Sequence, residues 1–229
     1  MADVRVRVGI CPRSQPFDEA LKSLNAAAVY ATQRGFHVMI DTVLRGAPGF
    51  QNYGPVMQHL IAAGDTHLFV GADDVILPLD CIVKLVEDDK DIVSGIYRKN
   101  TVDQLTPANY CDTWEEFAEK FKAGGLHQTQ WGAAHSMTIK RQVIEKMMAD
   151  YPELAYEQGE ETHYALFLPM IHERKCFQDD WAFSLRARQS GFTLWDDYSC
   201  RLRHYCYDFL GFEWLENQQK AEEEKCSTT

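Results

Sequence analysis

Residues 66–80 read Thr-His-Leu-Phe-Val-Gly-Ala-Asp-Asp-Val-Ile-Leu-Pro-Leu-Asp, and this stretch decides the fold. Its apolar run at positions 68–70 predicts a short buried strand. An acid pair, Asp73 and Asp74, follows that strand, and Pro78 suits the first position of a new helix. In open α/β sheets, ligands bind beyond the carboxyl ends of the strands, where this acid pair is expected to lie.

Two adjacent carboxylates at that place predict a divalent cation. They repel each other unless a cation lies between them, and their oxygens suit Mg²⁺ or Mn²⁺ held jointly with substrate phosphates. The alternative is a solvated turn that caps the helix. A capping residue stands directly before the first helical residue, which would make Leu77 the cap and place the acid pair too early.

Composition narrows the class of protein. With 229 residues, 45% of them hydrophobic, the chain can form one large domain with a full core. A net charge of −11 argues against a broad surface for nucleic acid. No signal segment and no apolar run of about 20 residues, the length of a membrane span, is found. The seven cysteines include no Cys-x-x-Cys, which favours free thiols. We therefore expect a soluble cytoplasmic protein, in the host cytoplasm if it is viral.

Strands and helices alternate over the first hundred residues. Strands are predicted at 4–10, 36–40, 68–70 and 92–97, with helices that begin near 17, 55 and 78 and a loop at 45–53. This alternation predicts a mostly parallel sheet with helices on both faces. The phosphate-binding motifs G-x-G-x-x-G and G-x-x-x-x-G-K-[ST] are absent, so no glycine cradle is expected to hold a nucleotide.

The second half has a different pattern. A capping box at Thr113–Glu116 opens a helix that ends at Gly124. Further predictions are a strand at 136–139, an amphipathic helix at 141–148, a long loop at 151–174 and a helix with an acidic start at 178–191. A last strand at 192–195 is expected to end at Asp196, with a polar tail from residue 213.

Several motifs together resemble a known family. Residues 66–78, followed by Asp91-Ile-Val-Ser-Gly-Ile-Tyr-Arg98, look like the metal-binding core of GT-A glycosyltransferases, which place a short acidic signature, often Asp-x-Asp, after a strand. The helix that begins with Asp179 and Asp180 is similar to the family's Glu-Asp helix. His204 stands at the place of the late metal-binding histidine of many members. The short chain looks most like soluble phage, bacterial or large-virus members.

The chain also departs from the family's pattern. Ala72 stands where the first acid of the signature is expected, so that only Asp73 and Asp74 remain. Gln51-Asn52 replaces the Arg-Asn found in many relatives, and Asp179 replaces a glutamate.

The resemblance implies a single α/β domain of the GT-A type, with a Rossmann-like, mostly parallel central sheet flanked by helices. Residues 1–100 would form the nucleotide-sugar-binding half, residues 101–212 the acceptor-binding half, and residues 213–229 a tail. The implied activity is a metal-dependent transfer of a sugar from a nucleotide sugar, with a UDP-sugar expected, to a hydroxyl of a glycan, glycoprotein or other acceptor. The implied cofactor is Mn²⁺ or Mg²⁺.

The resemblance also implies roles for individual residues. The metal ligands would be Asp74 first, with Asp73 and His204, and the catalytic acids would be Asp180 as the base and Asp179 beside it. Asp41 would accept a hydrogen bond from uracil, and Trp131 would begin a wall beside the donor sugar. The full set expected at the nucleotide sugar is Cys11, Pro12, Arg13, Asp41, Asn52, Asp73, Trp131, Gly132 and Ala133.

Structural roles and other functions stay open at this point. Asp41 can be a plain cap, Trp131 and His204 can be core residues, and Asp179 and Asp180 can merely serve their helix. A nucleotidyltransferase that makes sugar nucleotides would also use an acid pair, but it should carry a glycine-rich basic loop where residues 11–17 contain no glycine. A non-catalytic carbohydrate-binding domain would lack a metal-dependent nucleotide site.

Overall fold

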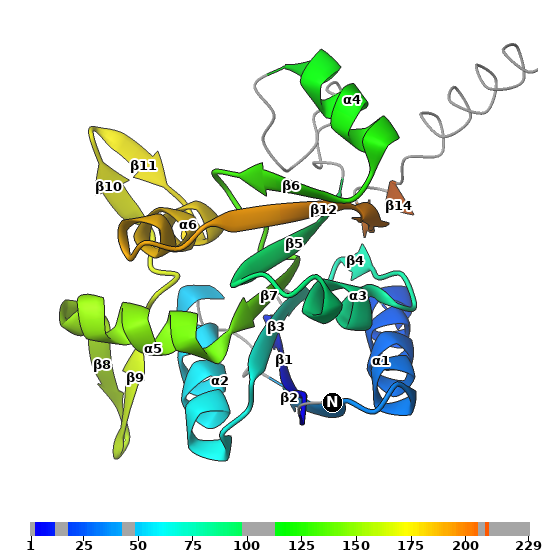
Figure 1. Cartoon of the computed structure of the whole chain (residues 1–229). Coiled ribbons are helices and arrows are strands. Elements are labelled where there is room, and N and C mark those ends of the chain that lie inside the picture. Colours follow the sequence, from blue (N-terminus) through cyan, green and yellow to red (C-terminus); the bar gives the residue numbers. More distant parts are fainter. Residues whose placement is uncertain (1–2, 12–17, 43–48, 98–112, 206–208, 211–229) are drawn as a thin grey trace, which may run out of the picture.

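The computed structural model describes residues 3–11, 18–42, 49–97, 113–205 and 209–210. A central sheet has the strand order β2-β1-β3-β7-β5-β12-β6 (Figure 1). β7 is antiparallel to both β3 and β5, β6 is antiparallel to β12, and the other five strands share one direction. The predicted mostly parallel sheet is therefore confirmed. The strands are β1 Arg5–Cys11, β2 His37–Thr42, β3 His67–Ala72, β5 Ile92–Ile96, β6 Leu126–Thr129, β7 Ser136–Lys140 and β12 Leu194–Arg201.

Helices cover both faces of this sheet (Figure 1). The side chains of β3 show why: Phe69 packs into a core cluster with α1 and α3, whereas Leu68 and Val70 join a cluster with α2, α5 and α6. All three side chains are fully buried, and each such burial contributes about 1.5–3 kcal/mol. The helices are α1 Asp18–Gln33, α2 Gly49–Ala63, α3 Cys81–Glu87, α4 Trp114–Ala123, α5 Arg141–Asp150 and α6 Asp179–Gln189.

A small second sheet joins two segments that lie far apart in the sequence. Its strands are β4 Val75–Ile76, β13 Arg203–Tyr205 and β14 Phe209–Leu210. β13 is antiparallel to β4, with His204 opposite Val75. This pairing places the C-terminal segment directly beside the acid pair that follows β3.

The predicted loop at 151–174 is wrong. The segment contains a 3₁₀ turn at Pro152–Leu154 and a hairpin of β8 Ala155–Gln158 with β9 Glu161–Tyr164. It also contains β10 Met170–His172, which pairs with β11 Lys175–Phe177. These strands are three or four residues long and mostly exposed, so they lack the apolar alternation by which a strand is predicted.

The predicted start of α2 is also wrong, because the helix begins at Gly49 and holds Pro55 inside it. Tertiary packing accounts for the earlier start. The ring of Tyr53 lies 4.6 Å from that of Phe167, and a Cβ on Gly54 would collide with the hydroxyl of Tyr156. The glycine therefore lets the first turns of α2 approach the β8–β9 hairpin.

Two further boundaries differ from the predictions. α3 begins at Cys81 rather than Pro78, because residues 78–80 form a turn in which the Cys81 amide donates to the Pro78 carbonyl at 3.1 Å. β12 does not end at Asp196 but continues to Arg201 between β5 and β6. Asp196 and Asp197 are consequently buried in the sheet.

The two predicted halves share the central sheet, in which β7, β12 and β6 from the second half join strands of the first, and the division of binding roles between them stays a prediction. The boundary near residue 100 and the predicted tail at 213–229 lie outside the described residues. In the described part of the chain, no helix combines the length and the apolar character needed to cross a membrane.

Candidate metal centre

The acid pair lies at the carboxyl edge of the central sheet, in the turn between β3 and β4. Asp73 is 3% exposed, whereas the side chain of Asp74 is 19% exposed. Asp74 is therefore the acid that a ligand from solvent reaches more easily. This location agrees with the expectation that the pair follows a buried strand and precedes a helix.

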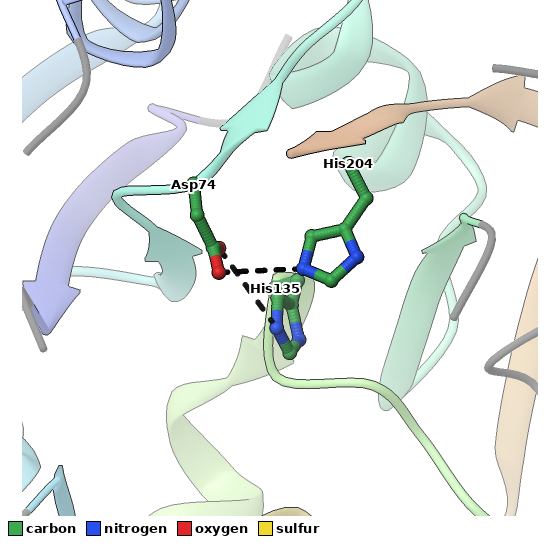
Figure 2. A group of neighbouring side chains, drawn as sticks. All are labelled: Asp74, His135 and His204. Atoms are coloured by element: carbon green, nitrogen blue, oxygen red, sulfur yellow. Dashed lines mark hydrogen bonds and ion pairs between the residues drawn. The ribbon is translucent and has the colours of Figure 1, made fainter. Parts of the chain in front are cut away.

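Two histidines from distant segments point toward Asp74 (Figure 2). His135 directly precedes β7, and because β7 is antiparallel to β3, its start lies at the edge where β3 ends. The Ala72 amide donates to the His135 carbonyl at 3.3 Å, which holds the two segments together. His204 comes from β13, beside β4.

The three side chains offer one carboxylate and two imidazoles. His204 Nε2 lies 3.3 Å from Asp74 Oδ2, and His135 Nε2 lies 4.0 Å from Asp74 Oδ1. One ligand atom from each side chain can be chosen so that all three lie within 4.8 Å of one another. Two ligands that bind one cation at about 2.1 Å lie at most about 4.2 Å apart, so small side-chain movements suffice for joint coordination. These donors fit a divalent metal ion.

Tyr97 packs against both imidazoles. Its ring centroid lies 4.4 Å from that of His135 and 5.0 Å from that of His204, and the tyrosine is buried. The side chains of His135 and His204 are themselves only 9% and 8% exposed. The imidazoles are therefore confined next to Asp74 rather than free to rotate into solvent.

Backbone hydrogen bonds fix the loop that presents His135. The Gly132 amide donates to Ser184 Oγ of α6 at 3.0 Å, and the Ala133 amide donates to Ser94 Oγ of β5 at 3.2 Å. A Cβ on Gly132 would lie 2.7 Å from Met137 Cε. The small residues thus serve the packing of this loop, and their predicted contact with a donor sugar stays a prediction.

Trp131, the first residue of the predicted sugar wall, belongs to an aromatic cluster. Its ring stacks on that of Trp181 with centroids 4.9 Å apart and lies 5.4 Å from the ring of Phe177. The guanidinium of Arg188 lies over the same ring at 4.9 Å. These contacts give Trp131 a packing role; its predicted contact with the sugar stays a prediction.

Asp179 and Asp180 form the first turn of α6, as predicted. The Asp180 amide donates to Asp179 Oδ1 at 3.0 Å, and the Trp181 amide donates to Asp180 Oδ1 at 2.9 Å. Negative charge at a helix N-terminus is stabilising. Both acids therefore serve their helix, and the catalytic role of either is a prediction.

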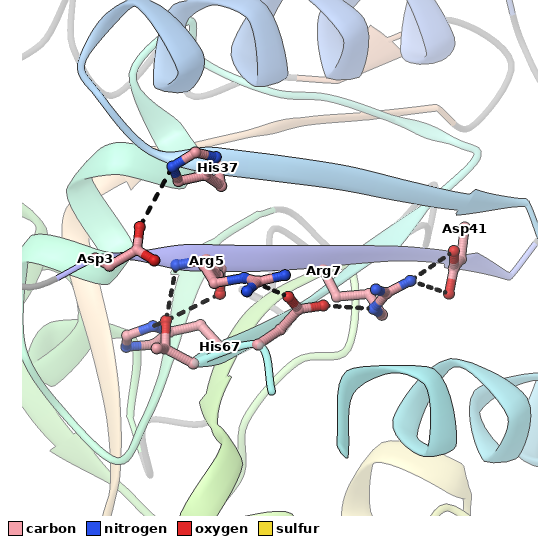
Figure 3. A network of polar contacts seen from close by, with 8 residues as sticks. Asp3, Arg5, Arg7, His37, Asp41 and His67 are labelled. Atoms are coloured by element: carbon pink, nitrogen blue, oxygen red, sulfur yellow. Dashed lines mark hydrogen bonds and ion pairs between the residues drawn. The ribbon is translucent and has the colours of Figure 1, made fainter. Parts of the chain in front are cut away.

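Asp41 belongs to a network of charged side chains and is not an isolated cap (Figure 3). Arg7 Nη1 donates to both carboxylate oxygens of Asp41 at 3.0 Å, and His59 Nδ1 lies 2.9 Å from Oδ2. Arg7 Nε also donates to Asp65 at 2.7 Å. Burial opposes the charge of Arg7, but hydrogen bonds to Asp41 and Asp65 raise its pKa above the usual value. Contact between Asp41 and uracil stays a prediction.

The structure describes only some of the other residues that were predicted to bind the nucleotide sugar. Cys11 ends β1 and Asn52 lies within α2, whereas Pro12 and Arg13 lie outside the described residues. His135 was not among the predicted ligands. Its position directly before a predicted strand was visible in the sequence, but nothing local indicates that this strand is antiparallel to β3.

The comparisons with known proteins show a similarity of fold alone. No protein-family model and no curated protein sequence matches the chain. Among solved structures, A197 from STIV is 13% identical, with a TM-score of 0.50 over 88% of this chain and 85% of that one. GalNAc-T7, solved with UDP, GalNAc and Mn²⁺, is 10% identical, with a TM-score of 0.50 over 88% of this chain and 43% of that one.

The catalytic domain of Drosophila β1,4-galactosyltransferase 7, solved with xylobiose, is 11% identical with a TM-score of 0.43; the match covers 85% of this chain and 65% of that one. The chain thus spans less than half of the GalNAc-T7 chain and about two thirds of the galactosyltransferase chain. The mixed α/β sheet with its flanking helices is the fold of the GT-A type that the sequence motifs predicted.

Proposed function

We propose that the chain is a metal-dependent glycosyltransferase that moves a sugar from a nucleotide sugar, a UDP-sugar, to a hydroxyl of a glycan or glycoprotein. The observation that carries the proposal is the meeting of Asp74, His135 and His204 at the carboxyl edge of the sheet. Ligands of open α/β sheets bind at this edge. The similarity of the fold to GalNAc-T7, a structure that contains UDP and Mn²⁺, supports the same assignment.

The donor set favours Mn²⁺ over Mg²⁺. Imidazole nitrogen is a ligand of transition metals, whereas Mg²⁺ is usually held by oxygen ligands and water. Among transition metals, Mn²⁺ also suits carboxylate oxygens, and it is the metal in the GalNAc-T7 structure. Two of the three proposed ligands are imidazoles, whereas the sequence predicted one imidazole, that of His204, beside the two aspartates. We infer that Mn²⁺ is the cofactor and that Asp74, His135 and His204 hold it, with Asp73 next to the ribose.

A bound cation would neutralise the charge that develops on the departing diphosphate. The chain's own residues would do the rest. Asp180 would take the proton from the acceptor hydroxyl as a general base, and Asp179 would contact the acceptor or orient the turn. Asp41, Asn52 and the segment Cys11–Arg13 would contact the nucleoside.

The test is the binding of UDP by titration calorimetry with Mn²⁺, with Mg²⁺ and in excess EDTA. We expect measurable affinity only with a divalent cation, and tighter binding with Mn²⁺, because a chain of net charge −11 repels a diphosphate. A screen of sugar nucleotides for Mn²⁺-dependent hydrolysis would then identify the donor. Equal UDP affinity in EDTA would exclude the proposal.

A surface variant supplies the control. Glu145 lies half exposed on α5, in an i,i+4 ion pair with Arg141. Glu145→Gln also removes one negative charge, so it should bind UDP and Mn²⁺ as the wild type does. The test variant is Asp74→Ala, which removes one negative charge from the cluster itself. If Glu145→Gln loses as much UDP affinity as Asp74→Ala, net charge rather than the cluster governs binding.

A further inference from the structure

Two cysteines far apart in the sequence meet in the core. Cys81 is the first residue of α3, and Cys200 lies near the end of β12. Their sulfur atoms are 3.3 Å apart, and the residues are 0% and 1% exposed. Both are free thiols, and neither is part of the metal centre.

We propose that Cys81 and Cys200 are a redox pair that oxidises to a disulfide and so joins α3 covalently to β12. A disulfide has an S–S length of about 2.05 Å, so the two sulfurs must approach by only about 1.2 Å. Their present contact shows that the side chains already point toward each other. We expect small rotations of the two side chains to bring the sulfurs to bonding distance.

The oxidant is a small disulfide such as glutathione disulfide. One cysteine thiolate attacks it, forms a mixed disulfide and releases one glutathione thiolate. The second cysteine thiolate then attacks the protein sulfur of that mixed disulfide and releases the second glutathione. The two protons of the protein thiols end on the two glutathione molecules, and no other reagent is consumed.

Burial slows the formation of the disulfide but does not disfavour the disulfide once it has formed. The hydrogen bond with Cys81 and the loss of solvent both raise the pKa of Cys200, which lowers the fraction of reactive thiolate. The oxidant therefore needs a transient local opening or an unfolded chain. Once the mixed disulfide has formed, the folded structure holds the second sulfur next to it, which favours ring closure over release.

The position of the pair gives the cross-link a consequence for the site. α3 follows the segment that carries Asp74, and β12 leads directly into β13, which carries His204. A bond between α3 and β12 therefore ties together the two segments that supply these ligands. The inference itself is independent of the proposed activity, since it rests only on the two sulfurs.

The experiment uses the full chain with Cys11, Cys111, Cys176, Cys206 and Cys226 replaced by serine, which leaves only the pair. The protein is brought to equilibrium in a glutathione redox buffer with a low urea concentration, and free thiols are then alkylated and mapped by mass spectrometry. We expect a peptide linked through Cys81 and Cys200 and no alkylation of either. The oxidised form should melt about 5–10 °C above the reduced form, because the link closes a long loop.

Further substitutions serve as controls. In the same background, Cys81→Ser leaves a single thiol, and a chain with serine at both positions should melt at one temperature with or without reductant. If Cys81→Ser does not fold, Cys200→Ala provides the same control from the other side. Two alkylated thiols at equilibrium, a stable glutathione adduct on either cysteine, or equal melting of the two forms would overturn the proposal.

Discussion

Two pairs of adjacent aspartates look alike in the sequence and differ in the structure. At the end of β3, Asp74 lies against two imidazoles that come from β13 and from the loop before β7. At the start of α6, the carboxylates of Asp179 and Asp180 each accept a hydrogen bond from the next backbone amide. Asp74 of the first pair thus has distant partners with metal-binding chemistry, whereas the hydrogen bonds described for the second pair are local.

This difference shows that the contacts of an aspartate pair indicate its chemical role better than the two aspartates themselves do. A carboxylate whose contacts are local can be explained by helix stability alone. A carboxylate that meets two buried imidazoles from distant segments has no such local explanation, and its donor set matches a metal site. Variants of the two pairs test this distinction directly.

The largest effect is expected for Asp180→Asn, because Asp180 is the proposed general base. General-base catalysis typically contributes about 10²–10⁴-fold, so the transfer rate should fall by that factor while UDP and Mn²⁺ affinity stay unchanged. Asp179→Asn should cost less. The measurement is the transfer rate compared with UDP affinity and Tm for both variants.

The alternative for this pair has a clear signature. If the acids only serve the helix, either substitution should lower stability by about 0.3–1 kcal/mol and leave turnover nearly intact. A fully active Asp180→Asn enzyme, or one whose loss of rate follows its loss of folded protein, would assign the pair to the helix.

Asp74→Ala should lower the affinity for Mn²⁺ by at least about 100-fold, because even residues that only support a ligand are worth about 10–100-fold. Asp73→Ala should cost less, since Asp73 is not in the cluster of three ligands. Mn²⁺ binding followed by electron paramagnetic resonance measures both. If Asp73→Ala costs more than Asp74→Ala, the order of the two acids is wrong.

His135→Ala and His204→Ala should each lower Mn²⁺ affinity by about 100-fold, for the same reason as Asp74→Ala. The reason is that each histidine would supply one of the three proposed ligands, so neither should be dispensable. His59→Ala is the matched control, because this histidine also pairs with an aspartate, Asp41, but lies outside the cluster. Unchanged affinity in His135→Ala would reduce the site to Asp74 and His204, two of the three ligands that the sequence predicted.

The sequence predicted the central elements well, because their signals are local. The apolar run before Asp73 and the capping box at Thr113 both describe short segments, and Thr113 indeed accepts a hydrogen bond from the Glu116 amide at 3.1 Å. The extended start of α2 depends on contacts with Phe167 and Tyr156, which no pattern within residues 45–55 contains. Tertiary packing therefore explains that error.

The candidate site was predictable in part for the same reason. Asp74 follows a strand, which sequence alone indicates, and His204 was expected from the family's motif order. His135 is a neighbour of Asp74 only because β7 is inserted antiparallel between β3 and β5. Strand order and direction are properties of the whole sheet, so this ligand could not be found from its own segment.

A third group of carboxylates, formed by Asp88 and Asp197, gives the smallest of the expected effects. Asp88 ends α3 and lies near Asp197, with Lys84 3.2 Å from Asp197. The pKa of Asp88 is raised to about 6, because burial disfavours its charge and Asp197 repels it. Here the acids interact with two lysines, Lys84 and Lys90, and with no imidazole among their described contacts, so the expected consequence concerns stability rather than metal binding.

The sign of the pH dependence follows from the direction of this shift. An aspartate in an unfolded chain has a pKa of about 3.9, so the folded chain binds the Asp88 proton more tightly. Its contribution to stability is fully present below about pH 4 and is lost as the pH rises through about 6. Since Asp88 is partly exposed to solvent, which screens the repulsion, the loss at pH 7 should be only about 1 kcal/mol.

Asp88→Asn removes the charge, so at pH 7 the variant should be more stable than the wild type and melt about 2–4 °C higher. At pH 4 the two should melt together, because the wild-type carboxyl is then protonated. Asp89→Asn is the matched control: this neighbour is exposed and bonded to Lys140, which lowers its pKa, so its loss should lower Tm at pH 7. Thermal melts of the three proteins between pH 4 and 7 decide the question. Equal melting of wild type and Asp88→Asn at pH 7 would mean that Asp88 stays charged at no cost, and that Lys84 compensates both carboxylates.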